Sequence, residues 1–146
     1  MTSPVRLAGA PRHQPKETNV QTAPEMIREF HAAMGDQPHS LGFPGEIVRT
    51  LRMRLIDEEV NELHDANASG DLVGIADALA DIVYVAYGTA YAHGIDLDAV
   101  LAEVHRSNMT KDFRGLAGDR KAKKGPGYVP PDIAGVLHGA EVPARG

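Results

Sequence analysis

The sequence contains no cysteine and no tryptophan, and aromatic residues make up only 5% of its 146 positions. Without cysteine, the chain can form no disulfide framework, cysteine-ligated zinc site, iron–sulfur cluster or thiol nucleophile. So few aromatic rings argue against a stacking platform for single-stranded nucleic acid. Hydrophobic residues nevertheless make up 42% of the chain, which is enough for a packed core and one ordinary domain.

Basic residues are missing from a long central stretch. Between Asp57 and Asp98 there are ten Asp or Glu residues and no Lys or Arg. Between Lys111 and Lys124, by contrast, six Lys or Arg residues accompany two Asp residues. This distribution is poorly suited to duplex DNA. It is typical of a protein that holds a divalent metal in one place and phosphate in another.

A secretory leader and an uninterrupted run of membrane-spanning length are also lacking. Residues 1–23 contain no apolar core of the kind that a signal peptide needs. The longest apolar stretch, residues 72–92, is interrupted by Asp77 and Asp81, which a membrane span would tolerate only at a high cost. We therefore expect a cytoplasmic protein with no membrane or nucleic-acid partner.

Apolar residues at helical spacing, separated by Pro and Gly, predict an all-α fold. We expect helices over residues 24–34, from 45 to 66 or slightly beyond, over 71–92, and from 96 or 98 to 111, with a short last turn over 131–137. Strand-like alternation of useful length is absent. The helical catalytic domain spans residues 23–111 and follows a mobile tail, residues 1–22. The basic C-terminal segment, residues 112–146, is expected to close over the site.

The third predicted helix is apolar nearly all round its circumference. Such a helix must be surrounded by other helices, and three further helices, one of them short, cannot cover it fully. We therefore predict a four-helix bundle that is completed by homo-oligomerisation, with a dimer as the first expectation and a tetramer as the other.

Acidic residues occupy positions on two helices where core residues belong. On a helical wheel, Glu58, Glu59 and Glu62 continue the inward apolar stripe of the second helix. Asp77 and Asp81 lie one turn apart among aliphatic neighbours on the third. Unpaired buried carboxylates cost roughly several kcal/mol each, so basic partners or a cation must offset them. Local basic partners are scarce, and clustered carboxylates favour Mg²⁺ or Mn²⁺. The alternative is an ordinary solvated face.

Polar and basic residues continue the inward stripe of the fourth predicted helix. Asn108 and Lys111 lie at its C-terminal end, and Lys121, Lys123 and Lys124 follow in a Gly- and Pro-rich loop. Our interpretation is that Lys111 reaches a phosphate or sugar of a metal-bound ligand, and that the loop acts as a lid that neutralises phosphate charge. The alternatives are a lysine that complements the helix dipole and a solvated tail.

Three segments carry a family resemblance: LIDEEVNE from Leu55, DALADIVY from Asp77 and EVHRSNMTK from Glu103. They resemble the MazG-like branch of the all-α nucleoside triphosphate pyrophosphohydrolases, to which phosphoribosyl-ATP pyrophosphohydrolase-like and dimeric dUTPase-like proteins are similar. The stretch KGPGYVPPDI from Lys124 resembles the C-terminal segment of some members. The likeness covers about residues 24–137.

The resemblance implies Mg²⁺-dependent hydrolysis of a nucleoside triphosphate to the monophosphate and pyrophosphate, by attack of a metal-activated water at the α-phosphorus. The expected substrate is a pyrimidine deoxynucleotide or a non-standard nucleotide. The family pattern, E-E-x-x-E followed by E-x-x-D, matches Glu58, Glu59, Glu62 and Asp81. Position 78, where the family usually has Glu, is Ala. Whether the adjacent Asp77 replaces that ligand is open.

The resemblance also assigns a role to each matching residue. Glu59, Glu62 and Asp81 are the expected metal ligands, and Glu58 is the water-activating base or a ligand of a second metal. The expected substrate contacts are Asn108, Lys111, Lys121, Lys123, Lys124 and, lining the pocket, Tyr84.

Three other classes are the alternatives. A non-catalytic helical dimerisation or nucleotide-sensing module would use the same helices without turnover. A di-iron carboxylate bundle normally draws on Glu-x-x-His, but Asn61 and Ala102 precede His64 and His105 by three positions. The dipeptide His64-Asp65 is typical of His-Asp phosphohydrolases, but the further histidines of such a site are not apparent.

Overall fold

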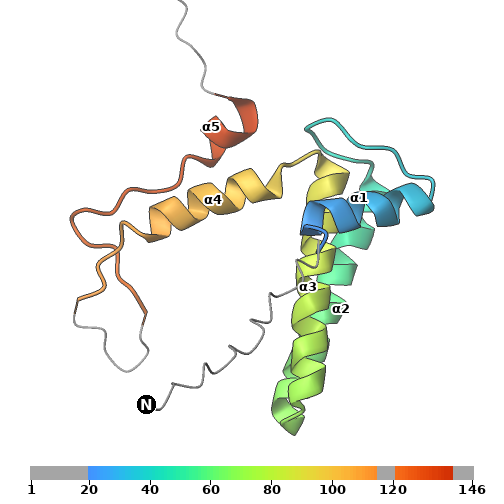
Figure 1. Ribbon diagram of the computed structural model, residues 1–146, viewed down its shortest axis with the longest axis horizontal. Coiled ribbons are helices and arrows are strands. Elements are labelled where there is room, and N and C mark those ends of the chain that lie inside the picture. Colours follow the sequence, from blue (N-terminus) through green and yellow to red (C-terminus); the bar gives the residue numbers. More distant parts are fainter. Residues whose placement is uncertain (1–19, 115–120, 140–146) are drawn as a thin grey trace, which may run out of the picture.

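The helices of the computed structural model, which describes residues 20–114 and 121–139, follow the predicted order. They are α1 (Ala23–Ala33), α2 (Glu46–Ser69), α3 (Leu72–His93), α4 (Leu97–Asn108) and α5 (Ile133–His138) (Figure 1). The described residues contain no strand, only an isolated antiparallel bridge between Asp112 and Lys123. The all-α prediction is confirmed. Most of the predicted N-terminal tail lies outside the described residues.

The helices begin and end at the residues that sequence signals indicate. Asp71 and Asp96 are the N-caps of α3 and α4, and each side chain accepts a hydrogen bond from a backbone N–H in the first turn. Gly70 and Gly94 end α2 and α3 in the left-handed conformation, with φ of 69° and 65°. Glycine adopts this conformation without steric cost, so it stops both helices sharply.

Helices α2 and α3 form a long antiparallel hairpin (Figure 1). Two glycines of α3 fix its register. A methyl group built on Gly74 would lie 3.1 Å from Cβ of Ala66, and one built on Gly88 would lie 2.8 Å from Nη1 of Arg52. The two residue numbers add up to the same value in the Gly74–Ala66 pair and in the Gly88–Arg52 pair. Residues that face each other on two antiparallel helices always have this property. This register determines which side chains of α2 and α3 face one another.

Helix α1 crosses one end of the hairpin and packs against α3. Its inward residues Ile27 and His31 are each only 2% exposed. Phe30 meets Tyr84 of α3 edge to face, with ring centroids 5.5 Å apart. The aromatic contacts therefore tie α1 to the middle of α3.

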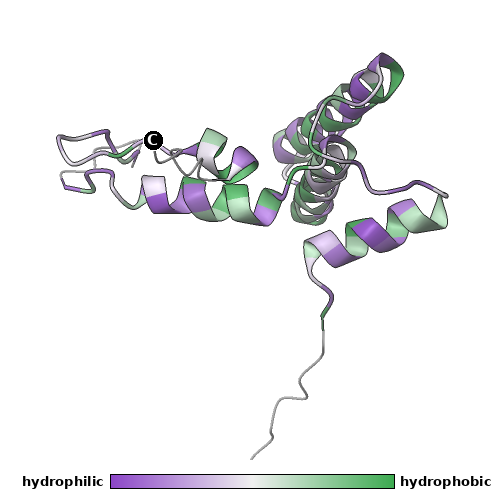
Figure 2. Cartoon of the chain, turned by 90° about the horizontal axis from the view of Figure 1, so that it is seen from above, coloured by the Kyte–Doolittle hydropathy of each residue, from purple (hydrophilic) through white to green (hydrophobic). Residues whose placement is uncertain are grey.

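Helices α4 and α5, with the segment between them, form an arm (residues 97–114 and 121–139). Figures 1 and 2 both show the arm leading away from the hairpin. Oγ of Ser107 donates to the carbonyl oxygen of Val129 at 2.8 Å, and the backbone N–H of Asp132 donates to Glu103 at 2.7 Å. Glu103 also accepts two hydrogen bonds from Arg106, each 2.7 Å long. The returning chain is thus fastened along α4.

The fourth helix ends earlier than predicted. It stops at Asn108, and the predicted helical position of Lys111 was wrong. The backbone N–H groups of Thr110 and Lys111 bond to carbonyl oxygens three residues back, which closes a tight turn instead of a further α-helical turn. Asp112 then pairs with Lys123, so the chain turns back at this point.

A single chain leaves much apolar surface uncovered. Within the described residues, the fully buried apolar side chains are Ile27, Ala78, Ala90 and Ala92. Leu72 and Val73 of α3 are 77% and 80% exposed, and Ile47 of α2 is 86% exposed. The four helices therefore do not enclose a bundle core within one chain. Completion by a second copy stays a prediction.

By length and composition, α3 could also cross a membrane. The central helix of a soluble assembly has the same properties, so this observation is weak evidence for a membrane span. The helix carries Asp77 and Asp81 and lies along α2. We therefore expect protein, from a second copy, to cover its remaining apolar surface.

Gly94 is expected to be more sensitive to substitution than Gly70. Both residues end a helix with positive φ, so Gly70→Ala should lower the free energy of unfolding by about 1 kcal/mol. A methyl group on Gly94 would in addition overlap the backbone of Ser40 and Leu41, whereas nothing lies near Gly70. Gly94→Ala should therefore lower the free energy of unfolding by at least twice as much, as measured by urea denaturation. Equal losses of stability in the two variants would contradict the packing of the Ser40–Leu41 backbone against Gly94.

Candidate active site

Five carboxylates gather across the middle of the hairpin. The register of α2 and α3 places Glu59 opposite Asp81, on the faces that the two helices turn toward each other. Burial raises the pKa of Glu59, and the negative charges of Glu62, Asp81, Glu58 and Asp77 raise it further. The structure thus brings together all five of the predicted acids.

Almost no positive charge offsets this acidic cluster. Among the described residues, its one ion pair joins Arg54 Nη2 to Glu58 Oε1 at 4.0 Å, and both side chains are more than half exposed. Such a surface pair contributes little. The cluster is therefore a concentration of negative charge, as the missing basic residues of the sequence predicted.

The carboxylates are less enclosed than the wheel pattern indicated. Glu59 and Asp81 are half-buried, but Glu58, Glu62 and Asp77 are exposed in the single chain. In the part of the chain that the structure describes, no three His, Asp or Glu side chains are placed as a metal-holding group. The donor set is nonetheless all oxygen and highly charged, which fits a hard divalent cation such as Mg²⁺ or Mn²⁺.

Ala78 lies beside this cluster, at the position where the family resemblance implies a glutamate. It is 2% exposed and lies opposite Glu62 in the α2–α3 register, where its methyl group fills the helix contact. The neighbouring Asp77 is exposed, yet its charge acts on Glu59. Asp77 therefore belongs to the same electrostatic cluster.

The predicted lysines also come together, but in the arm. Lys111, Lys121, Lys123 and Lys124 line one cavity of about 430 Å³. Nζ of Lys124 lies 5.0 Å from the centroid of the Tyr128 ring. Tyr128, which sequence reasoning did not select, has a lowered pKa because its hydroxyl bonds to Ser107 and because Lys124 and Lys111 are close. The exposed Asn108 lies at the end of α4, next to this basic cluster.

The acidic and basic clusters do not meet within one chain. Helix α4 is about 18 Å long and leads away from the hairpin (Figure 1), and Lys111 follows three residues after its end at Asn108. Tyr84, by contrast, is half-buried on the hairpin side, against Phe30. The arm packs mainly on itself, and closure of residues 112–146 over the carboxylates stays a prediction.

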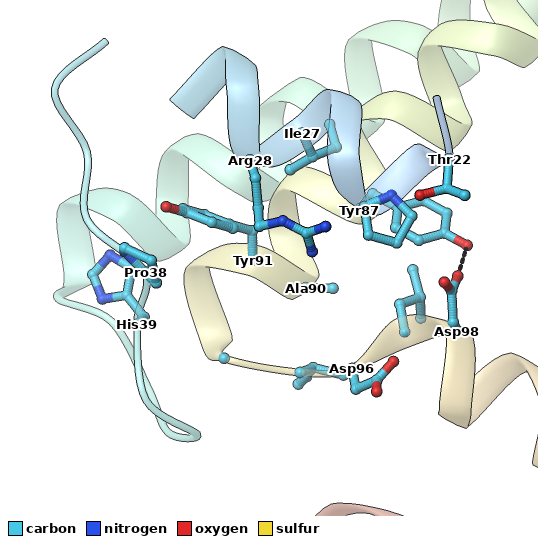
Figure 3. A pocket seen from close by; sticks show the side chains of 14 residues that line it. Thr22, Ile27, Arg28, Pro38, His39, Tyr87, Ala90, Tyr91, Asp96 and Asp98 are labelled. Carbon is cyan, nitrogen blue, oxygen red and sulfur yellow. Dashed lines mark hydrogen bonds between the residues drawn. The ribbon is translucent and has the colours of Figure 1, made fainter. Parts of the chain in front are cut away.

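A separate cavity of about 480 Å³ lies at the C-terminal end of α3. It is bounded by α1, by the loop that follows α1 and by the start of α4 (Figure 3). Arg28, His39 and Tyr91 line it, together with Tyr87, whose hydroxyl donates to Asp98 at 2.6 Å. Tyr91 lies about 15 Å from Asp81 along the helix. This cavity therefore contains none of the clustered carboxylates.

Arg52 is a half-buried charged group that the sequence analysis did not select. Arg52 was not counted in the inward stripe of α2, although it precedes Glu59 by two helical turns on the same face. Its guanidinium lies over Gly88, and Nη2 is 3.3 Å from Nε2 of His31. Two signals were available: the phase that Arg52 shares with Glu59, and Gly88, a glycine inside an apolar helix, which indicates a close approach by another group.

Comparisons with known proteins agree with this architecture. Residues 23–108, which include α1 to α4, match the pattern of the phosphoribosyl-ATP pyrophosphohydrolase family. The chain is also 42% identical over 84 residues to an uncharacterized protein of Acanthamoeba polyphaga mimivirus. This match covers 57% of the chain but only 34% of the viral protein, so the chain spans about a third of that relative. With a match over more than half of its length, the chain belongs to the phosphoribosyl-ATP pyrophosphohydrolase family.

Proposed function

We propose that this protein hydrolyses a nucleoside triphosphate, a pyrimidine deoxynucleotide or a non-standard nucleotide, to the monophosphate and pyrophosphate. The observation that carries the proposal is the acidic cluster, in which burial and the charges of four neighbouring carboxylates raise the pKa of Glu59 and a single exposed arginine offers compensation. Membership of a pyrophosphohydrolase family supports the same reaction class.

Glu59, Glu62 and Asp81 would hold the divalent cation, with Asp77 beside the position that Ala78 occupies. When bound, Mg²⁺ or Mn²⁺ supplies a polarised water and offsets the charge that develops on the phosphates. The Glu58 carboxylate, exposed at the edge of the cluster, would accept the proton of that water. The oxygen of the water forms the new bond to the α-phosphorus, the bond to the bridging oxygen breaks, and pyrophosphate leaves with its negative charge.

The basic cluster of the arm would bind the leaving phosphates. Lys111, Lys123 and Lys124 provide cations around one cavity, and Asn108 adds a hydrogen-bonding group next to it. Because the arm leads away from its own hairpin, we place it over the hairpin of a second copy. The opposite charges of the hairpin and the arm, and the uncovered apolar faces of the chain, support this homodimer. The protein would thus build each site from two chains.

A non-catalytic nucleotide-binding module is the second candidate. Ala78 favours it, because its methyl group leaves the cluster without the glutamate that the family usually has at this position. Both candidate functions include nucleotide binding, but only the first includes hydrolysis. A measurement of product release therefore distinguishes them.

Millimolar Mg²⁺ is expected to raise the melting temperature of the wild-type protein, because the cation relieves carboxylate repulsion in the folded state only. Glu59→Gln should remove most of this shift. Asp57→Asn is the matched control, since Asp57 is an exposed acid of α2 that does not act on Glu59. Thermal denaturation with Mg²⁺ and with EDTA measures the effect. Identical melting under both conditions would contradict the metal assignment.

Glu62→Gln is expected to abolish pyrophosphate release while the helical circular dichroism and the melting profile stay close to wild type. The amide keeps the shape of the side chain but removes a negatively charged oxygen from the proposed metal site. A panel of nucleotides with Mg²⁺, scored for pyrophosphate and orthophosphate, measures the reaction. Wild-type rates in the variant would refute the role of Glu62, and orthophosphate as the sole product would refute the proposed cleavage position.

Mixing two inactive variants tests the shared site. Glu62→Gln disables the hairpin and Lys111→Ala disables the arm, so each variant alone should be nearly inactive. After unfolding and refolding together, half of the dimers are mixed and each contains one intact site. About a quarter of wild-type activity should therefore return. If no activity returns although mixed dimers form, hairpin and arm act within one chain.

A further inference from the structure

The Arg52 side chain is half-buried, its Nε atom is enclosed by the fold, and the guanidinium has few partners. Its one hydrogen bond to the described residues runs from Nη2 to Nε2 of His31 at 3.3 Å, and Nε is buried without an acceptor. A guanidinium has five N–H donors. A buried donor without a partner costs about 1–3 kcal/mol, so packing alone would favour an apolar side chain. The two Nη groups therefore keep donors for a group from outside the chain.

His31 and Asp36 fix the position of this guanidinium. Arginine only donates hydrogen bonds, so Nε2 of His31 must accept, and Nδ1 then carries the proton and donates to Asp36 Oδ2 at 2.8 Å. The His31 ring is 2% exposed and is stacked on Tyr91, with centroids 4.4 Å apart. The ring cannot turn away, so it holds Arg52 from one side.

Gly88 holds the guanidinium from the other side by leaving room for it. A methyl group at this position would lie 2.8 Å from Nη1 of Arg52 and 3.5 Å from Nε2 of His31. Burial lowers the pKa of Arg52, and the charge of Asp36 opposes this effect. The positive charge is thus held in place with incomplete compensation, which is typical of a prearranged binding group.

Arg52 lies in line with the acidic cluster. On α2 it precedes Glu59 by two helical turns on the same face, about 10 Å along the axis. On α3, Gly88 follows Asp81 by the same two turns, with Tyr84 between them. Carboxylates, an aromatic ring and a guanidinium therefore succeed one another along the hairpin. A nucleotide with its α-phosphate at the carboxylates can direct its sugar and base toward Arg52.

We propose that Arg52 reads the nucleotide base by donating two parallel hydrogen bonds to an edge with two adjacent acceptors. Cytosine offers O2 and N3 on such an edge, and guanine offers O6 and N7. Adenine, thymine and uracil have no such edge. The phosphates do not need this arginine, because the lysines of the arm supply cations for them. The inference rests on the proposed function for the reaction, and it admits guanine nucleotides beside the pyrimidine and non-standard nucleotides proposed there.

The test compares kcat/KM for dCTP, dGTP, dATP, dTTP and dUTP with Mg²⁺ in wild type and Arg52→Gln. Wild type should prefer a cytosine or guanine nucleotide. Arg52→Gln should lower kcat/KM for that nucleotide by about tenfold or more and leave the others nearly unchanged. Arg52→Lys should behave like Arg52→Gln, since an ammonium cannot form the planar fork. Arg49→Gln, an exposed arginine on the same helix, is the control and should keep the wild-type preference.

Gly88→Ala provides an independent variant that keeps the arginine but displaces its guanidinium. Alanine is the better helix former, so the fold should persist, and the base preference should fall as in Arg52→Gln. A wild type without preference for cytosine or guanine would overturn the proposal. So would an equal loss for all nucleotides, which indicates a structural role, or an unchanged preference in both variants.

Binding separates this proposal from the proposed function. If wild type hydrolyses no nucleotide, the proposed reaction is wrong. The base preference is then measured as the binding of non-hydrolysable α,β-imido nucleotides in the presence of Mg²⁺. Tighter binding of the cytosine or guanine analogue in wild type, lost in Arg52→Gln, supports Arg52 as the base-reading residue. Equal dissociation constants in the two proteins contradict it, whatever the catalytic activity.

Discussion

Repulsion among carboxylates at the middle of the α2–α3 hairpin is the constraint on which the rest of the structure depends. Folding places Glu59 opposite Asp81 and within the field of three further acids, while Arg54 offers a single exposed contact of 4.0 Å. Like charges brought together in a partly buried place oppose folding unless something offsets them. A bound cation would do so, and the same cation would polarise a phosphate. The repulsion that opposes folding of the hairpin would then equip it for hydrolysis.

The division of the chain into hairpin and arm is the second constraint. The arm is held together by its own contacts, among which Arg106 and the backbone of Asp132 lower the pKa of Glu103 to about 2. It presents lysines, whereas the hairpin presents carboxylates and exposed apolar residues such as Leu72 and Val73. Two such units complement each other in charge and apolar surface. Because one chain keeps them apart, the proposed assembly of two copies would explain both the exposed surface and the separated clusters.

The sequence predicted the local structure well because the signals are local. Asp71 and Gly94 bound α3 as capping rules require, and the phase of Glu59 with the apolar stripe located the acidic cluster. The direction of the arm was not predictable, because it depends on a short connection after Gly94 that leaves no periodic pattern. The inward position of Arg52 was missed, although its phase on α2 matches that of Glu59. A wheel drawn for one helix does not show that Gly88 opens space on the facing helix.

The central claim is that divalent metal binds between α2 and α3. A crystal soaked in millimolar Mn²⁺, with data collected at the manganese absorption edge, tests it most directly. We predict an anomalous peak within bonding distance of Glu59, Glu62 and Asp81, with the three side chains drawn together around it. A well-ordered hairpin without a peak at these carboxylates, in any subunit, would contradict the claim.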